Sequence, residues 1–324
     1  MASAIFGRQA VSSLRQVLVV HPSPEERGGT DVHTPGSPTV RRRELGALLK
    51  ALRTERGWTA EQVGERLRFS SSKMSRLETG HRGASVRDIN DLCDLYQVDD
   101  KQRRRLLGLA REGKQRAWWQ PLGLRYSDYV GLEAEAVSIS DFGPSLVPGL
   151  LQTADYARAI VHAVSPDLEP DTVEQRVHAR MVRQQQFLVR EDAPRFEAIV
   201  DESVLHRVVG SRTIMRAQLK RLLELSAQPN ITLRVIPYQA GALPAGNDKF
   251  IVLRFAPAEV RDVVFIEGLT GDLYLEDPGD VETYSAAFRT LVKLAKSPKE
   301  TREIIAAMIP SYRGRPGRAT AAPA

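Results

Sequence analysis

The chain has 324 residues, of which 42% are hydrophobic and 27% are charged. This length favours two domains over a single small bundle, and the composition is ordinary for a globular protein. A single cysteine, Cys93, excludes an intramolecular disulfide, which is typical of a reducing compartment. No apolar run reaches the length of a membrane span and no signal-peptide layout is present, so we expect a cytoplasmic protein that does not enter a membrane.

The net charge of +6 is distributed unevenly along the chain. Residues 41–116 carry 19 Lys and Arg against 11 Asp and Glu, whereas residues 117–324 carry 24 against 26 and residues 1–40 carry three of each. The basic excess therefore lies in one short segment. Such a segment is expected where a protein meets a polyanion, and a solvated basic face would give the same count.

Residues 1–40 are predicted to form a disordered extension. The stretch His21–Pro38 holds four prolines and few large apolar side chains, so it cannot bury enough surface to fold.

From Arg41 the pattern changes, because Leu45, Leu48, Leu49 and Leu52 recur on one helix face. Gly57 ends this first helix.

Four more short helices are predicted before residue 116. Thr59 and Gln62 have the spacing of a capping box, which opens a helix over Thr59–Leu67. Arg68–Ser70 is a tight break before a third helix over Ser71–Thr79, which Gly80 closes. A fourth helix follows Ser85, and a fifth runs from Lys101 to about Arg116. Residues 41–116 are therefore predicted to form a compact all-α domain of five helices.

The remainder is predicted to be an α+β domain over residues 117–308 with a mostly antiparallel sheet, followed by a disordered tail over residues 309–324. The breaks at Gly241–Gly246 and Ala256–Val260 favour hairpins between the later strands. We expect helices at Gly131–Asp141, Thr153–Ala163, Asp171–Val189, Arg212–Ala227, Pro278–Ala295 and Lys299–Met308. We expect strands at Arg195–Val200, Ile231–Ile236, Phe250–Phe255, Val263–Glu267 and Gly271–Glu276.

The second and third helices have the geometry of a helix-turn-helix. This motif needs two short helices, a tight turn and polar side chains on the outer face of the second helix, which enters the major groove. The outward residues of Ser71–Thr79 are short or cationic and can donate to base acceptors. The candidate base-contacting residues are Ser71, Ser72, Lys73 and Arg76.

Two stretches carry a resemblance to a known family. Gly57-Trp-Thr-Ala-Glu-Gln-Val-Gly-Glu-Arg-Leu67 and Ser70-Ser-Ser-Lys-Met-Ser-Arg-Leu-Glu-Thr-Gly-His-Arg82 resemble the Xre/lambda-repressor-like helix-turn-helix family. The resemblance implies base contacts by the four residues above and phosphate contacts at Thr59, Gln62 and Arg82. It also implies that Glu78 is structural, bracing the bundle through an internal ion pair or cap.

The chain departs from the family pattern at three positions. Ala60 stands where the family often has a DNA-contacting glutamine, and Ala84 stands where a proline is usual. Arg68 replaces the usual turn glycine and adds a cation, which we count among the expected phosphate contacts. A helical bundle without DNA-binding activity is the alternative, and the joint match of caps, turn, spacing and charge disfavours it.

The second domain also resembles a known type. Pro144-Ser-Leu-Val-Pro-Gly-Leu-Leu-Gln152-Thr-Ala-Asp-Tyr-Ala-Arg-Ala159 is similar to the opening of an uncharacterised domain paired with this helix-turn-helix in actinobacterial antitoxin-like or developmental regulators. The resemblance implies a sensing role or the binding of a small protein that is encoded nearby.

Two charged features of the second domain leave alternatives open. Arg176, Arg180 and Arg183 share one predicted helix face, which is either a solvated face or a candidate surface for an acidic partner or an anionic effector. The segment Glu259–Glu282 holds eight acids without the spacing of a calcium loop, so it is a solvated face or a contact for a basic partner.

The sequence therefore predicts a sequence-specific transcriptional regulator that binds double-stranded DNA as a homodimer. An antitoxin-like interaction protein, whose DNA binding would be autoregulatory, is the alternative function. No metal-ligand spacing, phosphate loop or catalytic constellation stands out, so we expect no metal, no cofactor and no enzymatic activity.

Overall fold

The computed structural model describes residues 37–122, 127–188, 193–244, 246, 248–268 and 271–312. Most of the two segments predicted to be disordered, residues 1–40 and 309–324, lies outside these ranges. Residues 38–40 belong to the first described helix, and residues 309–312 form a short 3-10 helix.

Five helices make up the N-terminal part of the described chain, in the order that the sequence predicts. They are α2 (Pro38–Glu55), α3 (Ala60–Leu67), α4 (Ser71–Glu78), α5 (Val86–Tyr96) and α6 (Asp100–Glu112). Helix α2 begins three residues earlier than expected. Pro38 occupies its first turn, where a missing N–H costs nothing, and Val40 is buried among side chains of the C-terminal domain.

The helical domain has its own apolar core. Leu45, Leu49 and Leu52 of the predicted stripe are buried, while Leu48 is half-buried at its edge. The other buried members come from the remaining helices and the α4–α5 loop: Val63, Met74, Leu77, Ala84, Ile89, Leu92, Cys93, Tyr96, Leu106, Leu109 and Ala110. Cys93 is thus a core side chain.

The C-terminal domain is built on a six-stranded sheet. Its strands are β1 (Ser138–Gly143), β2 (Arg195–Asp201), β3 (Ile231–Ile236), β4 (Phe250–Arg254), β5 (Val263–Glu267) and β6 (Asp272–Leu275), in the spatial order β3-β2-β1-β4-β5-β6. The pairings of β1 with β4, β4 with β5 and β5 with β6 are antiparallel, and the β4–β5 pairing confirms the hairpin predicted at Ala256–Val260. The hairpin predicted at Gly241–Gly246 is wrong, because β3 pairs with β2 at the edge of the sheet while β4 pairs with β1 and β5. The pairings of β1 with β2 and β2 with β3 are parallel.

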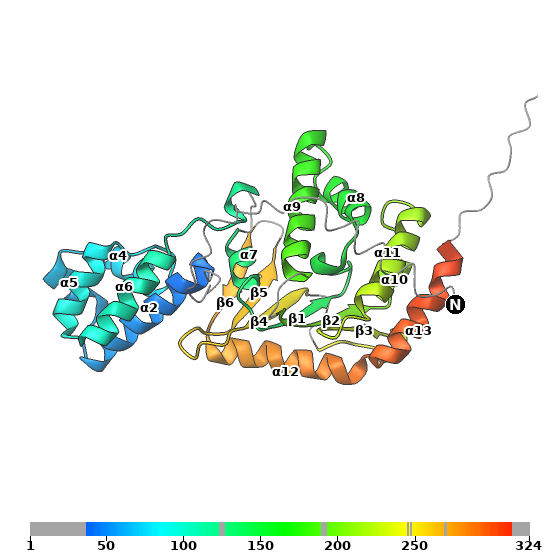
Figure 1. Cartoon of the computed structure of the whole chain (residues 1–324). Helices are drawn as coiled ribbons and strands as arrows, with labels where there is room; N and C mark the ends of the chain where they lie inside the picture. The colour runs from blue at the N-terminus through cyan, green and yellow to red at the C-terminus, as the bar shows by residue number, and fades with distance from the viewer. Residues whose placement is uncertain are drawn as a thin grey trace, which may run out of the picture. The chain divides into compact units, whose positions relative to one another are not determined.

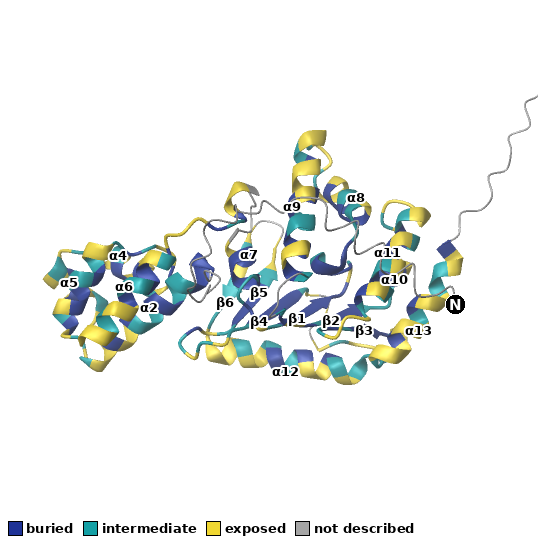
Figure 2. Ribbon diagram, viewed as in Figure 1, coloured by how far each residue is buried: buried dark blue, intermediate teal, exposed yellow. Residues whose placement is uncertain are grey.

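Helices cover both faces of the sheet (Figure 1). Helix α12 (Pro278–Leu294) lies along one face, where Phe288 and Leu291 pack on Phe142 and Phe250. The other face is covered by helices that include α7 (Ser127–Glu133), α9 (Pro170–Leu188) and α11 (Arg212–Leu225). Figure 2 shows buried residues concentrated on the sheet and on the inner sides of the helices.

Shorter elements complete the domain. They are η2 (Gln120–Leu122), η3 (Gly149–Leu151), α8 (Ala154–Val164), α10 (Ser203–His206), η4 (Tyr238–Ala240), α13 (Pro298–Met308) and η5 (Ile309–Tyr312). The connections from β1 to β2 and from β2 to β3 contain helices, as parallel pairings require. The α+β prediction is therefore confirmed.

One predicted element is wrong. The sequence predicted a helix over Gly131–Asp141, but α7 ends at Glu133 and residues 138–143 form β1, which lies inside the sheet. Ile139 packs on the α7 and α9 side of the sheet, whereas Phe142 packs on the α12 side. A strand buried on both faces lacks the alternation of polar and apolar residues that identifies a strand from sequence.

Across the described ranges, no helix combines the length and the apolar character that crossing a bilayer requires.

Candidate nucleic-acid interface

Local hydrogen bonds fix the start of both helices of the helix-turn-helix. The Thr59 hydroxyl accepts from the backbone N–H of Gln62 at 3.2 Å, and the Gln62 side chain accepts from the N–H of Thr59 at 2.9 Å. This confirms the predicted capping box. The Ser70 hydroxyl likewise accepts from the N–H of Lys73 at 3.1 Å and begins α4. Side-chain caps of this kind satisfy donors that a helix N-terminus otherwise leaves unpaired.

The turn between α3 and α4 depends on a left-handed arginine. Arg68 has φ 55° and ψ 38°, and its N–H donates to the carbonyl oxygen of Gly64. Phe69 N–H bonds the same carbonyl oxygen at 2.8 Å. A β-carbon on Gly64 would lie 2.8 Å from the Phe69 carbonyl oxygen, so this position has no space for a side chain. The chain therefore turns from α3 into α4 within three residues, and the Arg68 side chain is exposed.

Three of the four candidate base-contacting residues are exposed on α4. Ser71, Ser72 and Arg76 face solvent, while Met74 and Leu77 are buried in the core of the helical domain. The Arg76 guanidinium donates from Nε to the Ser72 carbonyl oxygen at 3.1 Å and from Nη2 to the Ser72 hydroxyl. Arg76 and Ser72 therefore present a joined set of donors on the outer surface of α4.

Lys73, the fourth candidate, is placed differently. Its ammonium nitrogen lies 2.7 Å from Asp88 Oδ1 and 3.4 Å from the centre of the Phe69 ring. The side chain is only 21% exposed. Lys73 therefore points along the bundle towards the start of α5.

The expected phosphate-contacting residues all lie at the surface. Thr59, Gln62, Arg68 and Arg82 are exposed. The side chains of Thr59 and Gln62 already serve the cap of α3. The backbone N–H of Arg82 donates to the Arg76 carbonyl oxygen at 3.0 Å, which anchors the loop after α4. Within the described residues, no hydrogen bond or ion pair is found for the guanidinium groups of Arg68 and Arg82.

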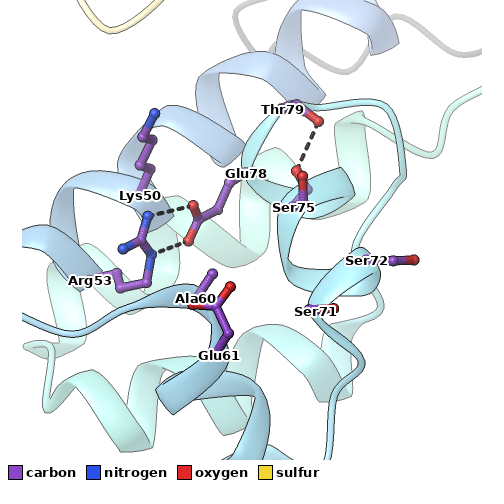
Figure 3. Close-up of a pocket in the computed structure, with 9 residues that line it drawn as sticks. All are labelled: Lys50, Arg53, Ala60, Glu61, Ser71, Ser72, Ser75, Glu78 and Thr79. Atoms are coloured by element: carbon purple, nitrogen blue, oxygen red, sulfur yellow. Dashed lines mark hydrogen bonds and ion pairs between the residues drawn. The ribbon is translucent and has the colours of Figure 1, made fainter.

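A hollow of about 470 Å³ lies between α2, the start of α3 and α4 (Figure 3). Its lining residues are Lys50, Arg53, Ala60, Glu61, Ser71, Ser72, Ser75, Glu78 and Thr79. The small Ala60, where the related family often has glutamine, leaves this hollow open. Sequence reasoning missed Lys50 and Ser75. Lys50 could have been found, because it precedes Arg53 by three residues and so shares its helix face.

An ion pair joins the two walls of the hollow. Two nitrogen atoms of the Arg53 guanidinium contact the two carboxylate oxygens of Glu78, at 2.6 and 2.9 Å. Figure 3 draws both contacts as dashed lines. The bond to Glu78 is the main reason that the pKa of Arg53 is raised. This confirms the structural role expected for Glu78.

The three arginines of α9 do not share one exposed surface. Arg176 is exposed, Arg180 is half-buried and donates to the Gln152 side chain at 2.7 Å, and Arg183 is buried with Nε 3.0 Å from Glu133 Oε1. Burial increases along the helix because its later turns pass over the sheet. Only the first two arginines are available at the surface.

Two carboxylates of the acidic segment contact arginines of the helical domain. Glu276 lies 2.6 Å from Arg43 on α2, and Glu259 lies 2.7 Å from Arg105 on α6. The contact between Arg105 and Glu259 is the main reason that the pKa of Arg105 is raised and that of Glu259 is lowered. The basic partner of these two acids is thus found within the chain.

A buried carboxylate lies beneath α7 and α9. Asp141 of β1 is 4% exposed, and its Oδ1 atom has no hydrogen-bond partner among the described residues. The pKa of Asp141 is raised to about 6, mainly by burial. The positive charge of Lys249 lowers this pKa, and the negative charge of Glu133 raises it further. The described part of the chain contains no group of three or more His, Cys, Asp and Glu that could hold a metal ion.

Two family models match the chain. Residues 44–106 match a helix-turn-helix domain, which covers the geometry described above. Residues 126–307, more than half of the chain, match the model described as domain of unknown function (DUF5753). The chain belongs to the DUF5753 family. No curated protein and no solved structure matches this DUF5753 protein. Its helix-turn-helix domain indicates a DNA-binding regulator, while the family name leaves the role of the larger domain open.

Proposed function

We propose that the protein is a sequence-specific transcriptional regulator whose helix α4 enters the major groove of double-stranded DNA. The observation that carries this proposal is the exposed set of donors formed by Ser71, Ser72 and Arg76 on a capped helix that follows a tight turn. Hydroxyl and guanidinium groups donate to the acceptors that guanine and adenine present in that groove.

Phosphate contacts would hold α4 in register. Arg68 and Arg82 flank the helix with exposed guanidinium groups, and Thr59 and Gln62 lie exposed at the N-terminus of α3. Lys50 and Ser75 line the hollow beside α4 and join this set as additional candidates.

The test begins with full-length protein selecting duplexes from a random-sequence library. Fluorescence anisotropy then compares a selected duplex with a scrambled one. Arg76→Ala should weaken the selected complex by about 1–3 kcal/mol and relax specificity, whereas Arg82→Ala should weaken both complexes and reduce the salt slope by about one unit. Arg261→Ala, an exposed arginine of the C-terminal domain, is the matched control. Equal wild-type affinity for the two duplexes would contradict the proposal.

We propose further that two copies bind one site. A single α4 covers one groove face, and a two-fold symmetric site is the usual solution for a helix-turn-helix protein. Selected duplexes should then contain inverted half-sites, and light scattering of the complex should give two chains per duplex. Half-sites without symmetry would contradict this arrangement.

The C-terminal domain is proposed to bind a small protein or an effector. The exposed Arg176 and the half-buried Arg180 support an acidic or anionic partner. Resemblance to antitoxin-like regulators supports the alternative in which sequestering such a partner is the main role. Co-purification with the product of an adjacent small gene, lost on Arg176→Glu and retained on Arg261→Glu, would support this role. Failure to co-purify would count against it.

A further inference from the structure

The Lys73 ammonium group lies between the Asp88 carboxylate and the Phe69 ring. It lies 2.7 Å from Asp88 Oδ1 on the first turn of α5 and 3.4 Å from the ring centre of Phe69 in the turn before α4. The two charged side chains are 21% and 16% exposed. A single cation therefore touches the turn, α4 and α5 at once.

Both carboxylate oxygens of Asp88 accept hydrogen bonds. Oδ1 accepts from the Lys73 ammonium group, and Oδ2 accepts from the backbone N–H of Ser85 at 3.3 Å. Its own N–H donates to the Ser85 hydroxyl at 2.9 Å, which completes a capping box at the start of α5. Burial would raise the pKa of Asp88, but the hydrogen bonds from Lys73 and Ser85 outweigh it and hold that pKa below its usual value.

Phe69 ties the same cation to the turn. Its ring packs at the edge of the core of the helical domain, and its N–H bonds the Gly64 carbonyl oxygen at 2.8 Å. A cation over an aromatic face is stabilised by the ring quadrupole, more so where water is excluded. To reach a base or a phosphate, Lys73 would have to give up both contacts and leave the Asp88 charge without its partner.

Resting on the proposed DNA-binding function, we propose that Lys73 and Asp88 are a positioning pair, which sets the direction in which Ser71 and Ser72 leave α4, and that Lys73 contacts neither base nor phosphate. Ser71 and Ser72 immediately precede Lys73, so a shift of this turn moves both hydroxyls. The pair thereby governs specificity through the two serines.

The salt dependence of DNA binding separates positioning from contact. A plot of log affinity against log salt concentration has a negative slope, and each phosphate contact that is lost reduces the magnitude of this slope by about one unit. Lys73→Met keeps the side-chain stem over Phe69 and removes the charge. It should weaken binding to the selected duplex by about tenfold with the slope unchanged. Lys73→Arg, which keeps both contacts, should restore most of the affinity. Lys220→Met, an exposed lysine on α11, is the charge-matched control.

Asp88→Asn gives the opposite result under the two roles. If Lys73 contacts DNA, removing the Asp88 charge frees it and affinity stays equal or rises. If the pair positions α4, Asp88→Asn weakens binding as Lys73→Met does, and the double variant is no weaker than the weaker single variant. A slope reduced by one unit in Lys73→Met, or additive losses, would overturn the proposal. Wild-type protein that selects no duplex would instead refute DNA recognition itself, so the two failures are distinct.

Discussion

Arg53 and Glu78 form a two-point ion pair that joins α2 to the last turn of α4, with Nε–Oε1 and Nη2–Oε2 distances of 2.6 and 2.9 Å. The third branch of the Arg53 guanidinium donates to the Trp58 carbonyl oxygen at 2.7 Å, just before α3. One side chain therefore connects all three elements around the hollow. Their relative positions decide whether α3 and α4 can contact one duplex together.

Glu78→Ala should lower the free energy of unfolding by about 2–3 kcal/mol, because the Arg53 charge is left without its partner. The two side chains are only 14% and 7% exposed, so solvent screens this pair weakly. Denaturant unfolding of the full chain measures the loss. Glu55→Ala is the control, since Glu55 is 75% exposed and lies 3.7 Å from Arg56. It should cost less than about 0.5 kcal/mol. Equal losses in both variants would contradict the bracing role.

Gly46 allows α2 and α4 to approach closely. A β-carbon at this position would lie 2.5 Å from the Glu78 carbonyl oxygen and 2.6 Å from that of Leu77. Gly46→Ala should therefore destabilise the protein by about 2 kcal/mol or more, because backbone atoms must shift. Gly108→Ala in α6 is the matched control, with its nearest atom 4.0 Å away. Better helix propensity should make it stabilising by about 0.5–1 kcal/mol. Thermal unfolding measures both, and a stabilising Gly46→Ala would refute the close approach.

Arg68 holds a left-handed conformation at a cost in stability. Arg68→Gly should raise the free energy of unfolding by about 1 kcal/mol, because glycine adopts a positive φ without steric strain. Gln97, the left-handed cap of α5 with φ 49°, is the matched control. Gln97→Gly should give a similar gain and leave DNA binding unchanged. If Arg68 contacts a phosphate, Arg68→Gly alone should lower the salt slope by about one unit. An unchanged slope would remove Arg68 from the phosphate contacts.

Asp141 should make stability depend on pH. Its folded pKa of about 6 lies above the ordinary value of 3.8 for an aspartate. The folded state therefore holds a proton that the unfolded state has released between these pH values. The stabilisation linked to this proton is fully present below pH 3.8 and is lost as the pH rises through about 6.

Asp141→Asn tests this linkage without a large change in shape. At pH 8 the substitution should stabilise the protein by about 1–3 kcal/mol, because an ionised carboxylate is no longer buried. Near pH 4 the two proteins should differ little. Unfolding free energies across this pH range provide the measurement, with Asp280→Asn at an exposed position of α12 as the control. A gain of the same size at both ends of the range would show that Asp141 is not the titrating group.

The sequence alone determined the helix-turn-helix. Its helices, the capping box at Thr59 and the break at Arg68 depend on contacts between residues a few positions apart, so local patterns reveal them. Hydrophobic periodicity likewise placed the later strands and the β4–β5 hairpin, but it gave the wrong neighbour for β3, which pairs with β2.

Tertiary structure decided the features that depend on distant partners. Strand β1 is buried on both faces and lacks alternation, so its pattern did not separate it from a helix. Asp88 lies 15 residues from Lys73, and Glu133 lies 50 residues from Arg183. The residue types show that these four side chains are charged, yet only the packing of α5 and α7 against their neighbours determines that the two pairs form and are largely shielded from solvent. Long-range contacts of this kind leave no periodic pattern in the local sequence, because the two partners are far apart in the chain and meet only after folding.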